Sequence, residues 1–374
     1  AEMVTPKRHH KCATIESENN SMKLLGATIM KCNLVSIDLA KSIFQICGFD
    51  EDRKILFNKK VKRSNLIYEL TKIDPTNIVM EACYSSNPWG RRIEKIGHKV
   101  FLIPAFVVKP FVIGNKNDHN DSIAIGEAFF RPRIRFVAVK TVEQQDIQSL
   151  TKIKDLLTKQ QTALSNQLRG LLAEYGLVMA KTRAALCHAV PYLLEDAENE
   201  LSPVSRSFIH RQYENLKHTT EQIEAVKQEL HELVKEKTDY QRLLTIPGVG
   251  PIIAATLMGT LPDPESFKNG RQLAAWLGLT PSQYSSGEVN RMGTITKRGN
   301  SALRRLLIHG ARSVLNWCDN KSDGLSVWLK RLKQRMPGNK AAVALANKLA
   351  RIIWRVLAKN EVYDVKLACA GSST

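Results

Sequence analysis

Residues 33–61, NLVSIDLAKSIFQICGFDEDRKILFNKKV, contain the pattern that decides the fold expected for the first part of the chain. Three runs rich in apolar and β-branched residues, 33–38, 42–50 and 54–61, are separated by short polar connections. Runs of this length bounded by turn residues are typical of strands, and short connections join antiparallel neighbours. The stretch therefore predicts a meander of antiparallel strands.

Alternating helix and strand patterns follow the meander. The expected elements are a helix over 65–73, a strand over 77–82, a helix over 88–97, a strand over 99–105 and a helix over 117–130. A three-stranded meander followed by a β-α-β unit has the order of an RNase H-like sheet. We therefore predict an RNase H-like α/β domain over residues 30–140.

Four carboxylates occupy special positions in this pattern. Asp38 ends the first strand, and Glu81 ends a later apolar strand. Asp118 and Asp121 open the last helix, where a spacing of three places both on one helix face. Each acid by itself could be a helix cap or a solvated strand end, but an acid at the end of an apolar strand is costly unless something uses it. A pair of Mg²⁺ ions would use all four acids, because Mg²⁺ prefers oxygen ligands and a two-metal site holds both the attacking and the leaving oxygen of a phosphodiester.

The composition favours a globular protein that binds polyanions. The 374 residues carry 55 Lys and Arg against 36 Asp and Glu, a net charge of +19, and 43% of them are hydrophobic. Nucleic acid is the expected partner, with a membrane surface as the second choice. No apolar run reaches the roughly 18 residues of a spanning helix, so we expect a cytoplasmic protein associated with the nucleoid and not with a membrane. The seven cysteines are scattered without metal-ligand spacing and are expected to be reduced thiols.

The middle of the chain, residues 141–240, reads as a helical or coiled-coil linker. An amphipathic pattern begins at Gln144, and a later set of apolar residues repeats every seven positions: Ile209, Leu216, Ile223 and Leu230. Between these patterns Gly176, Pro191 and Pro203 predict a broken connector with short helices. Two interpretations remain open, a helical hairpin within one chain and a coiled coil that joins two chains.

Residues 241–360 are expected to form a mainly helical domain. LLTIPGVGPIIAATLMGTL, residues 243–261, places a glycine turn between two apolar helices. This resembles a helix-hairpin-helix, whose turn could offer backbone N–H groups to a phosphate, but the same turn can simply join two core helices. Candidate phosphate contacts are Arg291, Lys297, Arg298, Arg304, Arg305, Lys348, Arg351 and Arg355. A solvated basic surface would show the same pattern.

A polar stretch inside this domain, PSQYSSGEVNRMG at 281–293, reads as a turn with two adjacent serines, Ser285 and Ser286, before Gly287. An unactivated hydroxyl is a poor nucleophile, and the only acid or histidine close by in sequence is Glu288. Taken alone, these residues favour an ordinary turn.

Three segments, 36–50, 80–105 and 115–145, resemble the RuvC-like DEDD domain of insertion-sequence transposases of the IS110 family, closest to its IS1111 branch. The resemblance runs from about residue 30 to about residue 358. Its D, E, D and D positions are matched by Asp38, Glu81, Asp118 and Asp121. The segment 246–300 resembles the C-terminal transposase domain of the same family. There a nucleophilic serine stands just before a glycine, so Ser286 is the matching residue and Ser285 the weaker candidate.

The resemblance implies a Mg²⁺-dependent enzyme that cuts and rejoins DNA strands. Its partners would be donor and target DNA, a guide-type structured RNA encoded by the element, and further copies of the chain in a dimer or tetramer, assembled with help from the middle region. The alternatives are a RuvC-like junction nuclease that hydrolyses with metal-activated water, and a non-enzymatic architectural DNA-binding protein. We expect tails at 1–29 and 361–374, with Met30 as the native start.

Overall fold

The computed structural model describes residues 31–364 except 116, 133, 262 and 288, so the tail expected at 1–29 and most of the tail expected at 361–374 lie outside the described residues. The chain divides between Val139 and Lys140 into two compact units. Among the described residues, no helix combines the length and the apolar character needed to cross a membrane.

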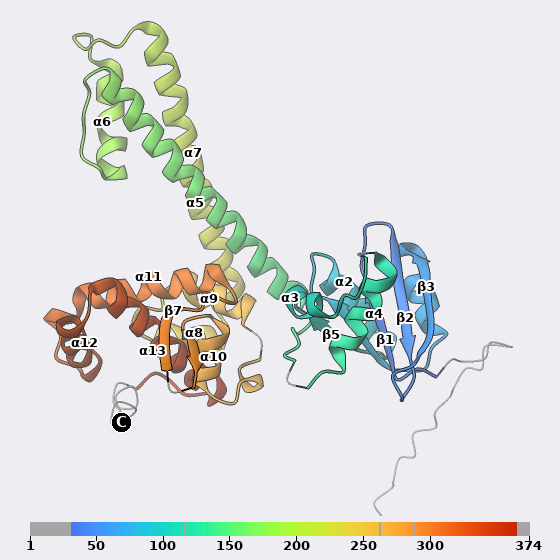
Figure 1. Ribbon diagram of the computed structural model, residues 1–374. Helices are drawn as coiled ribbons and strands as arrows, with labels where there is room; N and C mark the ends of the chain where they lie inside the picture. Colours follow the sequence, from blue (N-terminus) through green and yellow to red (C-terminus); the bar gives the residue numbers. More distant parts are fainter. Residues whose placement is uncertain (1–30, 116, 133, 262, 288, 365–374) are drawn as a thin grey trace, which may run out of the picture. The chain divides into compact units, whose positions relative to one another are not determined.

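The first unit is built on a mixed five-stranded sheet with the order β3-β2-β1-β4-β5 (Figure 1). Its strands are β1 (Leu34–Asp38), β2 (Ile43–Phe49), β3 (Ile55–Lys62), β4 (Asn77–Glu81) and β5 (Lys99–Ile103). The first three strands are antiparallel neighbours, and β4 runs parallel to both β1 and β5. The predicted meander followed by a β-α-β unit is confirmed.

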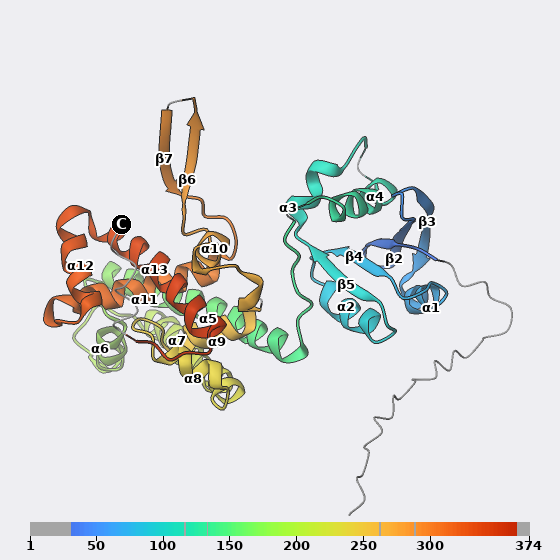
Figure 2. The ribbon, with the colours of Figure 1, turned by 90° about the horizontal axis from the view of Figure 1, so that it is seen from below.

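Helices cover both faces of this sheet. The helices are α1 (Leu66–Thr71), α2 (Ser86–Glu94), α3 (Ala105–Val108) and α4 (Asp118–Phe129), with short 3₁₀ turns at Arg63–Asn65 and Lys109–Phe111. Figure 2 shows α4 on one side of the sheet and α1 and α2 on the other. Two buried clusters match these faces, one around Ile37, Met80 and Trp89 and the other around Leu34 and Val79 beneath α4.

The second unit begins with a long helical arm formed by α5 (Val142–Glu174), α6 (Arg183–Glu195) and α7 (Pro203–Val234) (Figure 1). The helices α5 and α7 pack against each other within one chain. The residues of the seven-residue repeat are buried inside the chain: Ile209, Leu216, Ile223 and Leu230. The structure thus has the hairpin that was one of the two interpretations of this repeat.

The break predicted at Pro191 is wrong, because this proline lies inside α6. A proline lacks the N–H that would bond the carbonyl four residues earlier, which here belongs to Cys187. The Tyr213 hydroxyl of α7 donates a hydrogen bond to that carbonyl at 3.1 Å. A neighbouring helix therefore supplies the donor that the proline removes.

The remainder of the second unit is mostly helical. Its helices are α8 (Thr238–Leu244), α9 (Pro251–Thr260), α10 (Gly270–Trp276), α11 (Ser301–Trp317), α12 (Gly324–Arg335) and α13 (Gly338–Ala358), with 3₁₀ turns at Pro264–Ser266 and Cys318–Asn320. The glycine turn between α8 and α9 packs on α11. A Cβ on Gly310 would lie 2.0 Å from the carbonyl oxygen of Gly248, so this turn has a packing role that only glycine permits.

The polar stretch 281–293 is not a simple turn. It forms most of an antiparallel β-hairpin of β6 (Pro281–Ser286) and β7 (Val289–Ile295), which projects from the helices of its unit (Figure 2). Its residues are too polar and too exposed to show the alternation by which strands are predicted. Glu288, the acid noted near these serines in the sequence, lies outside the described residues.

Candidate active site

Two of the four acids share an end and a face of the sheet. Ile37 of β1 pairs with Met80 of β4 in parallel register, and Asp38 and Glu81 are the next residues of the two strands. Ile37 and Met80 belong to the cluster on the α1 and α2 face. Because successive side chains of a strand point to opposite faces, Asp38 and Glu81 belong to the face that α4 covers. Both are half-buried.

The other two acids lie in the first turn of α4, which packs on that same face. Asp118 is exposed and Asp121 is half-buried. The helix is capped by the Asn117 side chain, which accepts a hydrogen bond from the backbone N–H of Asn120 at 2.8 Å. The Ser36 hydroxyl of β1 donates to the Ser122 carbonyl at 2.6 Å and ties this turn to the sheet.

The four acids lie in one region of the sheet face that α4 covers, but their side chains do not form a metal-coordination site. Within the part of the chain that the structure describes, no group of three or more His, Cys, Asp or Glu side chains is placed to hold a metal ion. The chemistry of the donor set nevertheless fits a hard divalent cation, since all four candidates offer only carboxylate oxygens. Asp38, Glu81, Asp118 and Asp121 are the residues that could hold such an ion.

The candidate nucleophile lies at the tip of the hairpin. Ser286 forms the last pair of the ladder with Val289, and Gly287 begins the connection with a positive φ of 59°. Ser286 is exposed, and its hydroxyl makes no hydrogen bond to another described residue. The Ser285 hydroxyl, in contrast, donates to the Asn290 side chain and accepts from Gln283 at 2.9 Å.

The register of the hairpin sorts its side chains onto two faces. Directly opposite residues share a face, and so do residues two apart along a strand. The Ser286–Val289 pair therefore shares a face with the Tyr284–Arg291 pair, while Ser285 lies on the other face. Arg291 is thus the candidate cation on the face of Ser286.

The base of the hairpin is held by close backbone packing. Gly278 and Gly299 have positive φ angles of 69° and 86°. A Cβ on Gly278 would lie 2.1 Å from the Arg298 carbonyl oxygen, and one on Gly299 would lie 1.9 Å from the Trp276 carbonyl oxygen. The Arg304 guanidinium also donates to the carbonyls of Leu277 and Arg298, at 3.0 and 3.1 Å. Sequence reasoning missed this clamp, although its glycines were a visible signal.

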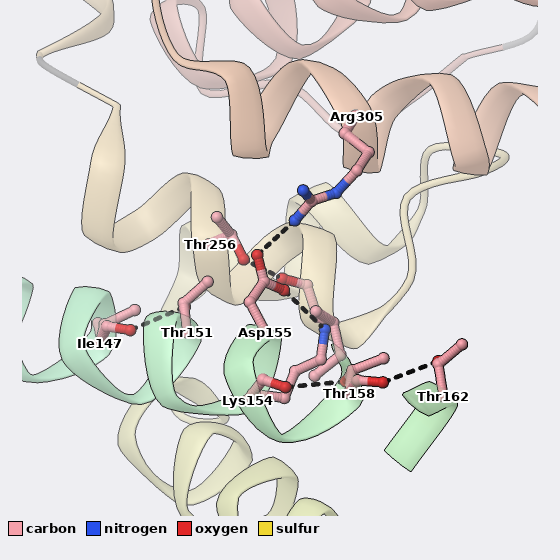
Figure 3. Close-up of polar contacts among 9 residues, drawn as sticks. Ile147, Thr151, Lys154, Asp155, Thr158, Thr162, Thr256 and Arg305 are labelled. Carbon is pink, nitrogen blue, oxygen red and sulfur yellow. Dashed lines mark hydrogen bonds and ion pairs between the residues drawn. The ribbon is translucent and has the colours of Figure 1, made fainter. Parts of the chain in front are cut away.

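Some of the candidate phosphate contacts already bind other parts of the protein. Arg305 of α11 forms an ion pair with Asp155 of α5, which Lys154 also contacts at 3.4 Å (Figure 3). Arg304 is engaged at the base of the hairpin, as described above. Lys297 and Arg298, at that same base, are exposed. Arg304 and Arg305 of α11 therefore have structural roles that the basic pattern of the sequence could not reveal.

Three basic residues of α13, Lys348, Arg351 and Arg355, line a cavity of about 440 Å³. Arg351 and Trp354 contribute to its wall, and Arg355 pairs there with Glu361 at 2.9 Å. The ammonium nitrogen of Lys348 lies 4.7 Å from the centre of the Trp328 ring. Of these three cations, Arg355 is therefore paired with an acid of the same chain.

Comparison with known proteins gives matches over both units. A family model described as "Transposase", of the DEDD type of IS110, matches residues 35–177, and a model described as "Transposase IS116/IS110/IS902 family" matches residues 240–325. The chain is 41% identical to the transposase for insertion sequence element IS1111A of Coxiella burnetii, over 95% of this chain and 96% of that protein. It is 36% identical to the transposase for insertion sequence element IS1328 of Yersinia enterocolitica, over 88% of this chain and 98% of that one.

These matches place the chain among the transposases, the enzymes that cut and rejoin DNA strands to move a DNA segment. It belongs to the IS116/IS110/IS902 family of insertion-sequence transposases, as the resemblance in the sequence implied.

Proposed function

We propose that this transposase breaks and rejoins DNA through Ser286, with Asp38, Glu81, Asp118 and Asp121 as ligands of Mg²⁺. In this proposal residues 30–140 form a RuvC-like catalytic domain, 141–240 link the domains, and 241–360 carry the serine. The observation that carries the metal part is the common face of the sheet: strand alternation and the packing of α4 bring four carboxylates to one region. The strand order of the sheet supports the RuvC-like assignment.

The serine would act as the nucleophile that preserves the energy of the broken bond. Its hydroxyl oxygen attacks the phosphorus and loses its proton, the bond from phosphorus to the deoxyribose oxygen breaks, and that oxygen takes up a proton. The product is a phosphoserine ester, from which a second DNA hydroxyl can displace the serine and close a new strand. Bound Mg²⁺ would neutralise the phosphate and favour the ionised attacking oxygen. Arg291, on the face of Ser286, would balance the charge that develops on the phosphate oxygens.

The choice of Ser286 over Ser285 is supported by the hairpin. Both serines are exposed, but the Ser285 hydroxyl is held by Asn290 and Gln283, whereas Ser286 lies next to Gly287. A nucleophile must reach phosphorus with a hydroxyl that is not engaged elsewhere. Among the described residues, the Ser286 hydroxyl has no hydrogen-bond partner, whereas the Ser285 hydroxyl has two. The neighbouring Tyr284 is 71% exposed and could stack on a DNA base.

RNA and oligomerisation complete the proposal. The resemblance implies an element-encoded structured RNA that pairs with donor and target DNA, and a net charge of +19 suits two polyanionic partners. The buried heptad residues of α7 leave other surfaces for assembly into a dimer or tetramer. The exposed apolar side chains of α5, Ile153 and Leu156, are candidates for that contact.

The decisive experiment is the search for a covalent protein–DNA adduct after denaturation. We expect the adduct with the wild type and with Ser285→Ala, and its loss in Ser286→Ala and Asp38→Ala. The two serine variants should still bind DNA, because the basic residues remain. Normal strand cutting by Ser286→Ala would show instead a nuclease that hydrolyses with water. Loss of the adduct only in Ser285→Ala would move the nucleophile by one residue.

A further inference from the structure

A buried polar network lies between the sheet and the first turn of α4. Gln45 of β2 pairs directly with Asp38 across the strands, so both side chains belong to the α4 face, and Gln45 is only 4% exposed. Its amide nitrogen donates to the side-chain oxygen of Asn58 at 2.5 Å. The amide nitrogen of Asn58 in turn donates to the carbonyl of His119, in the turn that carries Asp118 and Asp121, at 3.2 Å.

This chain of bonds fixes the orientation of both amides. A carbonyl only accepts hydrogen bonds, so Asn58 must present its nitrogen to His119 and its oxygen to Gln45. Gln45 must then present its nitrogen to Asn58. The Ser122 hydroxyl, which donates to the His119 carbonyl at 2.8 Å, lies 3.4 Å from the Asn58 oxygen and belongs to the same network. The Oε1 atom of Gln45 is therefore left as an acceptor.

That acceptor is buried and has no hydrogen-bond partner among the described residues. A buried polar atom without a partner is rare and costly, which points to a donor that arrives with a ligand. The neighbouring carboxylate of Asp38 cannot supply it, because an ionised carboxylate only accepts. A water molecule bound to a divalent cation is a strong donor, and Mg²⁺ usually keeps several waters.

We propose that Gln45 is a positioning residue of the metal site, whose Oε1 atom accepts a hydrogen bond from a metal-bound water next to Asp38. The inference rests on the proposed metal-binding role of Asp38. Through Asn58 the same side chain couples that water to the α4 turn with Asp118 and Asp121. Outer-shell partners of this kind typically change metal affinity by about 10- to 100-fold.

The test is a Mn²⁺ titration of the full chain, in which the spectrum of free hydrated Mn²⁺ is followed by electron paramagnetic resonance. Gln45→Met removes the acceptor with little change of volume, and we expect about 10- to 100-fold weaker Mn²⁺ binding at an unchanged melting temperature. Gln45→Glu keeps an oxygen at this position and should bind at least as tightly as the wild type. Ser122→Ala, which alters the network but keeps the Gln45 acceptor, should bind as the wild type does.

The outcomes separate this inference from the proposed function. If Asp38→Ala loses Mn²⁺ binding while Gln45→Met keeps it, the role of Gln45 is refuted and the metal site stands. Equal weakening in Gln45→Met, Gln45→Glu and Ser122→Ala would also refute it, because the network would then matter only for folding. If Asp38→Ala binds Mn²⁺ as the wild type does, the proposed metal function itself is wrong. Should Gln45→Met not fold, Gln45→Glu decides, and weakened binding in that variant overturns the inference.

Discussion

Substitution of Gly126 by alanine tests how tightly α4 is seated on the sheet. In an exposed helix this change should stabilise by about 1 kcal/mol, because glycine is the poorer helix former. Here a Cβ would lie 2.3 and 2.4 Å from two ring carbons of Phe49, far inside contact distance. Phe49 is 2% exposed and packs edge-on against Phe130 at 5.9 Å, so its ring has little room to move.

The magnitude follows from the competition of these two effects. Overpacking of a dense core typically costs about 1–3 kcal/mol. Set against a helix-propensity gain of about 1 kcal/mol, the expected net destabilisation is about 1 kcal/mol. The same clash would push α4 away from the sheet and displace Asp118 and Asp121, so we also expect reduced strand cleavage.

Gly170 provides the matched control. It lies in α5, is exposed, and a Cβ there would meet nothing within 4 Å. Gly170→Ala should therefore stabilise its helix by about 0.5–1 kcal/mol. Hydrogen exchange read by mass spectrometry measures both effects locally. Peptides of α4 should exchange about five-fold faster in Gly126→Ala, and peptides of α5 should exchange more slowly in Gly170→Ala. Unchanged or slower exchange of α4 in Gly126→Ala would refute the seating of this helix on Phe49.

Two further predictions concern charge. The Ser326 hydroxyl, at 2.6 Å, is the main cause that lowers the pKa of the Asp323 carboxyl, which caps α12. A carboxyl whose pKa is lowered in the folded state stabilises the fold at pH values above its unfolded pKa near 3.9, and this stabilisation is lost as the pH falls through the folded pKa. Asp323→Asn should therefore have a lower melting temperature than the wild type at pH 7 and the same melting temperature in acid. A difference in melting temperature that stays constant between pH 7 and pH 3 would contradict this. Arg291→Ala should weaken nucleic-acid binding and reduce its salt dependence. Arg305→Ala should change the salt dependence less, because the guanidinium of Arg305 is paired with Asp155 in the wild type. Equal effects of the two variants in binding titrations at several salt concentrations would contradict the structural role of Arg305.

The sequence predicted the first unit well because its signals are local. Apolar runs such as NIVME at 77–81 gave strands within a few residues of those observed, and the spacing of Asp118 and Asp121 placed both in the first turn of α4. The common face of Asp38 and Glu81 depends on register between strands about 40 residues apart, which no local pattern contains. The sequence could propose the four acids as a set, but only the strand register of the sheet shows that Asp38 and Glu81 share a face.

The polar network around Gln45 was invisible for a related reason. A glutamine in the middle of SIFQICGFD, residues 42–50, looks like the solvent-facing residue of an edge strand. In the structure β2 is an inner strand covered by α4, so Gln45 is buried and its amide nitrogen bonds Asn58 of β3, which in turn bonds the His119 carbonyl of α4. Burial on both faces of the sheet, and not the residue type, turns this side chain into a candidate for function.

The hairpin adds an observation to a choice between two serines that the sequence leaves open. Ser285 and Ser286 are adjacent and chemically identical, so their order along the chain does not distinguish them. Period-two alternation sends them to opposite faces of β6. Asn290 engages the Ser285 hydroxyl, whereas the Ser286 hydroxyl has no partner among the described residues. Because a one-residue shift of this register would exchange the two faces, Asn290 is the residue that reports on the assignment. Asn290→Ala should therefore free the Ser285 hydroxyl without moving Ser286, and the adduct should still form at Ser286. Transfer of the adduct to Ser285 in this variant would show that the hydrogen bond, and not the position at the tip, selects the nucleophile.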